Sequence, residues 1–155
     1  MRCVRRMMNR KEMFLDYKRE LCAMDGFDDL ADPLWTYLAD FSLFNSHKDA
    51  EWIPIKYDGK EVGFLVALSG ELVHNDTLDY YLWDAYVRPQ YRRLGLMKRA
   101  VDNYVRNHQG VYGLVMMDVN EGSHKFWGKA MGEPDEVRDW SWPGCHLYVY
   151  RKEKK

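Results

Sequence analysis

The sequence predicts a three-layer α/β (α+β) fold around one mixed, mostly antiparallel sheet of six to seven strands. Two apolar stretches, 79–87 and 112–119, flank an amphipathic stretch at 96–108, which indicates a β-α-β unit with a parallel, splayed central strand pair. Asp58–Gly59 separates two further apolar stretches, as in an antiparallel hairpin. The length of 155 residues fits a single domain over 1–155, and 46% apolar with 30% charged residues is typical of globular proteins.

One strand and two helices are expected in the N-terminal third. Residues 2–7 fit a short first strand. A capping-box pattern at 9–12 opens a helix near Arg10, with apolar residues at helical spacing up to about residue 23. Asp32–Pro33 is a favourable helix start, and the second helix is expected to end near residue 45.

The other strands follow in the remainder of the chain. Residues 51–57 and 61–68 form the hairpin, and Pro54 places its first strand at an edge or a bulge because proline has no amide hydrogen. The stretch 79–87 is apolar on both faces, which is typical of a strand inside a sheet. The predicted order is β-α-α-β-β-β-α-β-α-β-β, with the later elements at 96–108, 112–119, 122–131, 136–140 and 145–151.

Composition argues against several functional classes. Lys and Arg total 23 and Asp and Glu total 24, so the basic field of a sequence-independent nucleic-acid binder is missing. No apolar run approaches the roughly 18 residues of a membrane span, and the N-terminus has no apolar secretory segment. Cys3, Cys22 and Cys145 lack metal-ligand spacing. We expect a cytoplasmic protein without a metal, a nucleic-acid partner or a membrane partner, and both a monomer and a homodimer stay open.

The segment V-R-P-Q-Y-R-R-L-G-L-M-K, residues 87–98, has the features of an anion-binding turn. A strand ends at its start and a helix begins just after Gly95. The first helical turn has unpaired amides and a partial positive charge, and glycine lets a ligand approach the backbone. Arg92, Arg93 and Lys98 add charge, which favours phosphate. A loop with a solvated basic tip is the alternative, and neither common nucleotide-binding glycine pattern is present.

These residues resemble the acyl-CoA pyrophosphate loop of the GNAT superfamily of N-acyltransferases, whose pattern is Arg/Gln-x-x-Gly-x-Gly/Ala. Arg92 and Gly95 take the first two positions, and Met97 stands where glycine or alanine is usual. Asn120 at the end of the next strand, followed by Phe126–Trp127 and a later glycine, is similar to the family's second motif, with a tryptophan in place of tyrosine. The predicted element order also resembles the family's over nearly the whole chain.

The resemblance implies an N-acetyltransferase that moves an acetyl group from acetyl-CoA to a primary amine of a small molecule or peptide in a ternary complex. The thioester would enter between strands 79–87 and 112–119, and its pantetheine arm would pair with the backbone at Ala85 and Val87. The Val87 amide would stabilise the oxyanion. The cofactor site implied by the resemblance consists of Ala85, Val87, Arg92, Arg93, Leu94, Gly95, Leu96, Met97, Lys98, Asn120, Phe126 and Trp127.

The attacking amine has to lose a proton, because amines are mostly protonated at neutral pH. The family often places a glutamate on the strand before the loop, where this chain has Tyr81 and Trp83. Asp84 is therefore the candidate base, water-binding residue or acceptor anchor, with a purely structural buried aspartate as the alternative. Trp127 replaces the family's tyrosine acid, so Tyr81, Tyr86 or a water is the candidate proton donor.

An acidic cluster lies between the first two predicted helices, in the turn that overhangs the acceptor pocket in the family. It would attract a cationic amine, and a solvated, helix-capping loop is the alternative. Two other functions stay open. One is a regulatory domain that binds acyl-CoA without catalysis, and the other is a nucleic-acid-binding or protein-binding module without a thioester site. The cluster consists of Asp25, Asp28, Asp29 and Asp32.

Overall fold

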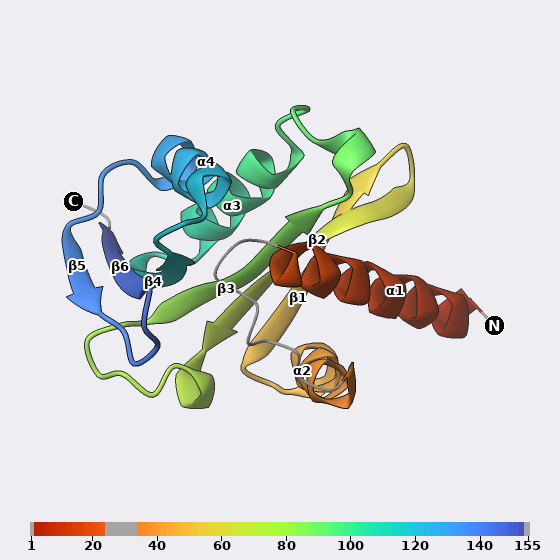
Figure 1. Cartoon of the computed structure of the whole chain (residues 1–155), viewed down its shortest axis with the longest axis horizontal. Helices are drawn as coiled ribbons and strands as arrows, with labels where there is room; N and C mark the ends of the chain where they lie inside the picture. Colours follow the sequence, from red (N-terminus) through yellow and green to blue (C-terminus); the bar gives the residue numbers. More distant parts are fainter. Residues whose placement is uncertain (1, 24–33, 154–155) are drawn as a thin grey trace.

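A computed structural model describes residues 2–23 and 34–153 of the chain (Figure 1). Within these residues the strands form one six-stranded sheet in the order β1-β2-β3-β4-β6-β5. The regular elements are α1 (Arg2–Cys22), α2 (Leu34–Ser46), β1 (Ala50–Tyr57), β2 (Lys60–Ser69), η1 (Gly70–Leu72), β3 (Tyr80–Val87), η2 (Pro89–Tyr91), α3 (Leu96–Asn107), β4 (Gly110–Met117), α4 (Glu121–Met131), β5 (Glu136–Asp139) and β6 (Cys145–Lys152).

The sheet is antiparallel except between β3 and β4. This parallel pair is in register at Tyr80–Tyr112 and Tyr81–Gly113, just after Asp79 N donates to Val111 O at 2.8 Å, and the two strands then part. Each keeps its other neighbour: β3 stays paired with β2 as far as Val87, and β4 stays paired with β6 as far as Met117. The predicted mixed sheet with a splayed parallel pair at its centre is confirmed.

The four helices of the described chain cover the sheet on its two faces (Figure 1). Met13 and Phe14 of α1 pack with Phe41 and Phe44 of α2 on one face. On the other face, α3 and α4 share a second core with Leu82, Val87 and Tyr112 of the strands, to which they contribute Met97, Val101, Tyr104, Trp127 and Met131. The fold thus has three layers, as predicted. None of the described helices is long and apolar enough to cross a bilayer.

The hairpin and the edge strand also agree with the prediction. Asp58 and Gly59 both have positive φ, 50° and 76°, as a two-residue hairpin turn of the favoured hand requires. β1, which contains Pro54, is an edge strand, and its register with β2 shifts between Ile55 and Lys56. Proline is tolerated there because an edge strand leaves one row of amides without ladder partners.

The predicted first strand is wrong, because residues 2–7 belong to α1, which begins at Arg2 and not near Arg10. Arginine, methionine, lysine and glutamate favour a helix, and residues 5–8 are exposed rather than paired in the sheet. The element order therefore begins α-α-β. The predicted acidic cluster and the Asp32–Pro33 helix start lie outside the described residues.

Candidate functional site

The parting of β3 from β4 exposes backbone groups on one edge of β3. Arg88 N donates to Val62 O at 2.9 Å, which fixes the phase of the β2–β3 ladder. Because antiparallel ladders alternate, Ala85 and Val87 turn their backbone groups away from β2, toward the gap. The Val87 carbonyl accepts from Arg92 Nε at 2.7 Å, and the Val87 amide lies beyond the last β3–β4 pair, where a ligand could accept from it. An extended ligand could add to this edge like a further strand.

The turn that follows β3 presents a row of amides. Arg93 and Gly95 have positive φ, 68° and 74°, and reverse the chain immediately before α3. The first helical hydrogen bond runs from Arg99 N to Gly95 O at 3.1 Å. Among the described residues, no side chain accepts a hydrogen bond from the amides of 93–98. These amides also donate to no backbone carbonyl outside a helix. This arrangement, with the positive end of α3, suits an anion such as a diphosphate.

Met97, the departure from the family pattern, does not cover these amides. Its side chain is 8% exposed and lies in the core under α3, in the same cluster as Val87 and Trp127. A Cβ on Gly95 would meet no atom within 4 Å, so the turn is open on that side. Leu94 is exposed beside it and Leu96 is half-buried against the core. The large residue at position 97 is therefore compatible with a ligand on the turn.

The basic side chains of the turn differ in their contacts: Arg92 joins the turn to α1, whereas Arg93 and Lys98 lie on the surface. Arg92 donates to Glu20 of α1 at 2.8 Å and lies over the Tyr86 ring, so it joins α1 to the end of β3. Lys98 pairs with Asp102 on the exposed surface of α3 at 2.8 Å. Arg93 is exposed on the turn itself. The backbone amides are thus the main candidate for binding an anion, with Arg93 and Lys98 as nearby charge.

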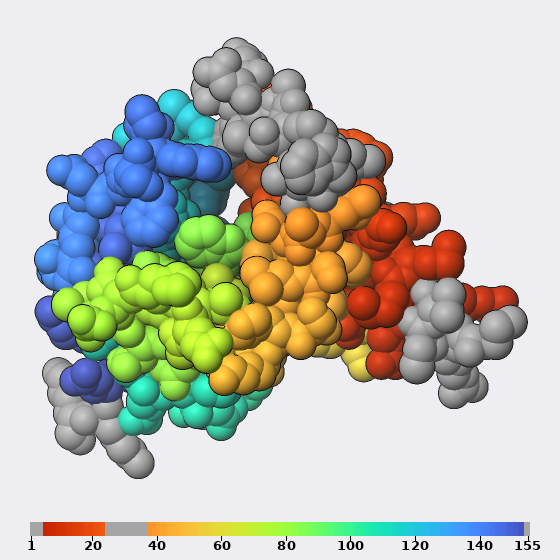
Figure 2. Space-filling model, turned by 90° about the horizontal axis from the view of Figure 1, so that it is seen from below, coloured from red at the N-terminus to blue at the C-terminus, as the bar shows by residue number. Residues whose placement is uncertain are grey.

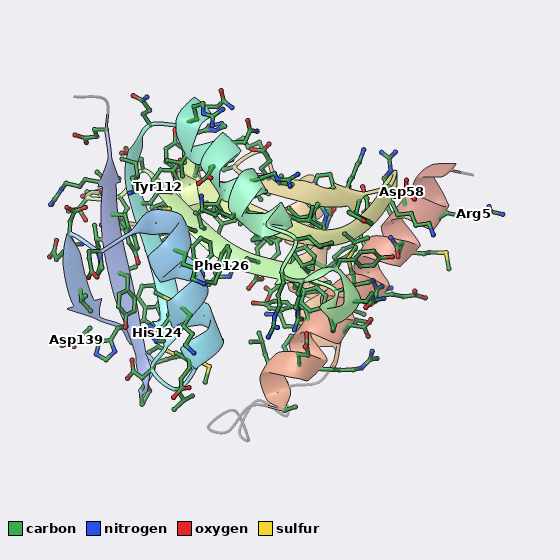
Figure 3. The ribbon with its side chains drawn as sticks, turned by 90° about the horizontal axis from the view of Figure 1, so that it is seen from above. Arg5, Asp58, Tyr112, His124, Phe126 and Asp139 are labelled. Carbon is green, nitrogen blue, oxygen red and sulfur yellow. The ribbon has the colours of Figure 1, made fainter. Side chains whose placement is uncertain are left out.

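The second motif packs against the first. Asn120 caps α4, since its Oδ1 accepts from Ser123 N at 3.0 Å. Phe126 and Trp127 lie edge to face, with ring centroids 4.9 Å apart. Trp127 is 6% exposed in the core that also contains Met97. Figure 3 shows Phe126 on the side of α4 that faces β3. The aromatic pair can therefore form a wall of the gap, but an indole at position 127 cannot supply a catalytic proton.

A bulge in β3 determines how the catalytic candidates are presented. Val66 pairs with Asp84 and Ala67 with Leu82, so Trp83 is the extra residue. Trp83 contacts the ring of Tyr81, and Asp84 contacts α1, which places both side chains on the α1–α2 face. An uninterrupted strand would have sent them to opposite faces. The sequence contained no clear signal of this bulge.

Asp84 is a buried carboxylate with one oxygen hydrogen-bonded and the other facing Lys18. It is 7% exposed, and Tyr17 of α1 donates to its Oδ1 at 2.7 Å. Oδ2 accepts no hydrogen bond from the described residues, and Lys18 Nζ lies 4.0 Å from it. Tyr17 and Lys18 were missed by sequence reasoning, because only the packing of α1 on β3 brings them to Asp84.

Burial governs the protonation of the groups around Asp84. It raises the pKa of Tyr17 well above its usual range, and the neighbouring negative charge of Asp84 raises it further. Burial also raises the pKa of the Asp40 carboxyl, which Lys18 partly offsets. Lys18 Nζ lies 5.2 Å from the centre of the Phe14 ring. Tyr17 therefore stays a hydrogen-bond donor at neutral pH and can hold Asp84 in one orientation.

Tyr81 and Tyr86 lie on the same face as Asp84. Tyr81 is 5% exposed over the last paired residues of β3 and β4, and Tyr86 is packed beneath α1 against Tyr17 and Phe64. Burial raises the pKa of both hydroxyls. They are weaker acids than free tyrosine, so each is better suited to donating a hydrogen bond than to releasing a proton.

Comparisons with known proteins bear on this geometry. A family model described as the acetyltransferase (GNAT) family matches residues 12–132, which include the parting strands, the turn and α4. No curated protein is significantly similar in sequence.

Solved structures share the fold. An acetyltransferase from Thermus thermophilus aligns with a TM-score of 0.64 and 17% identity, over 90% of this chain and 86% of that one. The PaiA N-acetyltransferase from Thermoplasma acidophilum, in complex with coenzyme A, has a TM-score of 0.63 and 14% identity over 94% and 92%. The microcin C7 self-immunity acetyltransferase MccE, in complex with acetyl-CoA and AMP, has 0.63 and 9% over 93% and 84%. Because the family model matches residues 12–132, more than half of the chain, the chain belongs to the acetyltransferase (GNAT) family.

Proposed function

We propose that the protein is an N-acetyltransferase that transfers the acetyl group of acetyl-CoA to a primary amine of a small molecule or peptide. The observation that carries this proposal is the open row of amides at 93–98 beside the parting ends of β3 and β4. Membership of the family supports the reaction class. Two of the similar structures contain coenzyme A or acetyl-CoA, which supports the choice of donor.

The cofactor would bind mainly through the backbone. The amides of 93–98 would hold its diphosphate, with Arg93 and Lys98 adding charge. Its pantetheine arm would add to the free edge of β3 at Ala85 and Val87, between β3 and α4. This mode needs no conformational change of Met97, since that side chain already lies in the core.

The amine would then attack the thioester directly. The Val87 amide would stabilise the negative charge that develops on the carbonyl oxygen. Asp84 would accept the proton of the amine through a water at Oδ2, a buried oxygen that lies 4.0 Å from Lys18 Nζ and accepts no hydrogen bond from the described residues. The carbon–sulfur bond breaks, and the CoA thiolate takes up a proton with a water, Tyr81 or Tyr86 as hydrogen-bond donor.

The experiment combines a binding and a turnover measurement on the full chain. Calorimetry with CoA is expected to give saturable binding, and thiol release from acetyl-CoA is expected to depend on an added amine, with the acetylated amine identified by mass spectrometry. Absence of CoA binding would contradict the cofactor site. CoA binding without turnover of any amine would instead favour a regulatory domain.

A further inference from the structure

Trp83 is more exposed than its position in the sheet predicts. β3 is an interior strand, and the neighbours of Trp83, Leu82 and Asp84, are 3% and 7% exposed. Trp83 itself is 37% exposed, on the face that α1 and α2 cover elsewhere. Figure 2 shows this side of the molecule hollowed between α2 in orange, the C-terminal part in blue and strand residues in green. The sheet is therefore accessible at the bulge.

Three aromatic rings line this opening, and we name Tyr81, Trp83 and Trp140 the aromatic shelf. The ring centroids of Tyr81 and Trp83 are 5.5 Å apart, and Trp140 lies 6.4 Å from each of them. Tyr81 lies against Gly113 of β4, where a Cβ would approach its ring to 2.9 Å. Because Trp140 follows β5 and Trp83 belongs to β3, the shelf extends across the place where β3 and β4 begin to part.

Within residues 2–23 and 34–153, the charges next to the shelf nearly cancel. Asp84 and the half-buried Asp40 face Lys18, and Arg138 near Tyr81 is paired with Glu136. The described residues here therefore offer a polycation little net charge attraction, whereas flat apolar groups gain from contact with exposed indoles.

We infer that the aromatic shelf is the acceptor subsite and that the acceptor is a primary amine carried on an aromatic group. This inference rests on the proposed function, because it is the thioester between β3 and β4 that makes the neighbouring hollow the acceptor side. In the reaction, the nitrogen–carbon bond forms, the carbon–sulfur bond breaks, and the proton lost by the amine balances the one gained by the thiolate.

The test compares acetyl transfer to 2-phenylethylamine, 2-cyclohexylethylamine and spermidine under identical conditions. We expect kcat/KM to be highest for the aromatic amine, by at least about tenfold over spermidine. Trp83→Ala should lower kcat/KM for the aromatic amine about tenfold, mainly through its KM, without changing the KM of acetyl-CoA. Trp142→Ala is the matched control, since Trp142 is 58% exposed outside the shelf.

A direct binding measurement separates this inference from the proposed function. The indole N–H signals of the CoA-loaded protein are followed by NMR during titration with 2-phenylethylamine. Shifts of the Trp83 and Trp140 signals, with or without turnover, would support the shelf as the amine site. Preference for spermidine, an equal loss for all amines in Trp83→Ala, or no shift of these two signals would overturn it. If Trp83→Ala does not fold, Trp83→Leu gives the same comparison.

Discussion

The two faces of the sheet contribute differently to the candidate site, one through backbone groups and the other through side chains. On the α3–α4 face, the site is a contiguous backbone turn at 93–98 backed by one apolar core. On the α1–α2 face, it is a set of side chains that α1, β3 and the residues after β5 bring together, among them Tyr17, Asp84 and Trp140. A backbone turn of this kind suits a diphosphate whatever else the ligand carries, whereas side chains from separate elements can change to suit different acceptors.

This contrast separates the half of the candidate site that would bind the cofactor from the half that would select the acceptor amine. The turn at 93–98 depends on two positive φ angles and on the start of a helix, so its geometry is local. The acceptor side depends on the bulge at Trp83 and on how α1 packs over β3. Substitutions on the two faces should therefore affect different steps, cofactor binding on one and amine turnover on the other.

The largest effect is expected for Gly95→Val on the cofactor face. Valine is strongly disfavoured at φ 74° and would place its side chain on the open side of the turn, where the diphosphate is expected. We expect CoA affinity to fall more than about a hundredfold by calorimetry, roughly 2.7 kcal/mol of binding free energy.

Gly59→Val is the matched control for that variant. Gly59 has φ 76° and equally empty surroundings, but it lies in the β1–β2 hairpin. It should reproduce the backbone strain and leave CoA affinity unchanged. A Gly95→Val protein that binds CoA within twofold of the original would show that the turn does not hold the diphosphate.

Asp84→Asn tests the acceptor face at its central residue. The substitution keeps the shape of the side chain and removes its ability to accept a proton. We expect kcat to fall about a hundredfold, in the range of general base catalysis, with unchanged CoA affinity. Asp139→Asn, on a fully exposed side chain of β5, is the control. Retention of full kcat in Asp84→Asn would assign a structural role to this carboxylate.

Tyr17→Phe should give an intermediate effect, because it removes the hydroxyl that donates to Asp84 Oδ1. Leaving a buried carboxylate oxygen without its donor costs about 1–3 kcal/mol, so the free energy of unfolding in urea should fall by that amount. We also expect kcat to fall about tenfold through loss of the Asp84 orientation. Tyr57→Phe, on an exposed tyrosine of β1, should change neither quantity.

The smallest effect concerns the core beneath α3 and α4. Burial raises the pKa of Tyr150 from about 10 to about 12. Below pH 10 both the folded and the unfolded state keep this proton. Between pH 10 and 12 only the unfolded state loses it, so the free energy of unfolding should fall by about 1.4 kcal/mol per pH unit from this residue. Urea unfolding at pH 9, 10 and 11 should show a shallower decline for Tyr150→Phe, and an identical decline would contradict the assignment.

Local patterns predicted most elements, and where they failed the cause was specific. Asp58–Gly59 and Pro54 predicted a hairpin turn and an edge strand correctly, because both depend on the conformational limits of single residues. Residues 2–7 were predicted as a strand and form a helix, because a few alternating apolar residues carry less weight than a helix-favouring composition continuous with a longer helix.

The pattern from Val87 to Lys98 predicts an anion-binding turn, and the turn and the helix start that such a site needs are present, since glycine conformation and helix polarity act within a few residues of one another. It did not reveal that Met97 turns into the core or that Arg92 reaches Glu20 on α1. Nor could it show that the bulge in β3 turns Trp83 and Asp84 to one face, next to Tyr17. Those contacts join residues far apart in the chain, and their energies exist only once the helices have packed on the sheet.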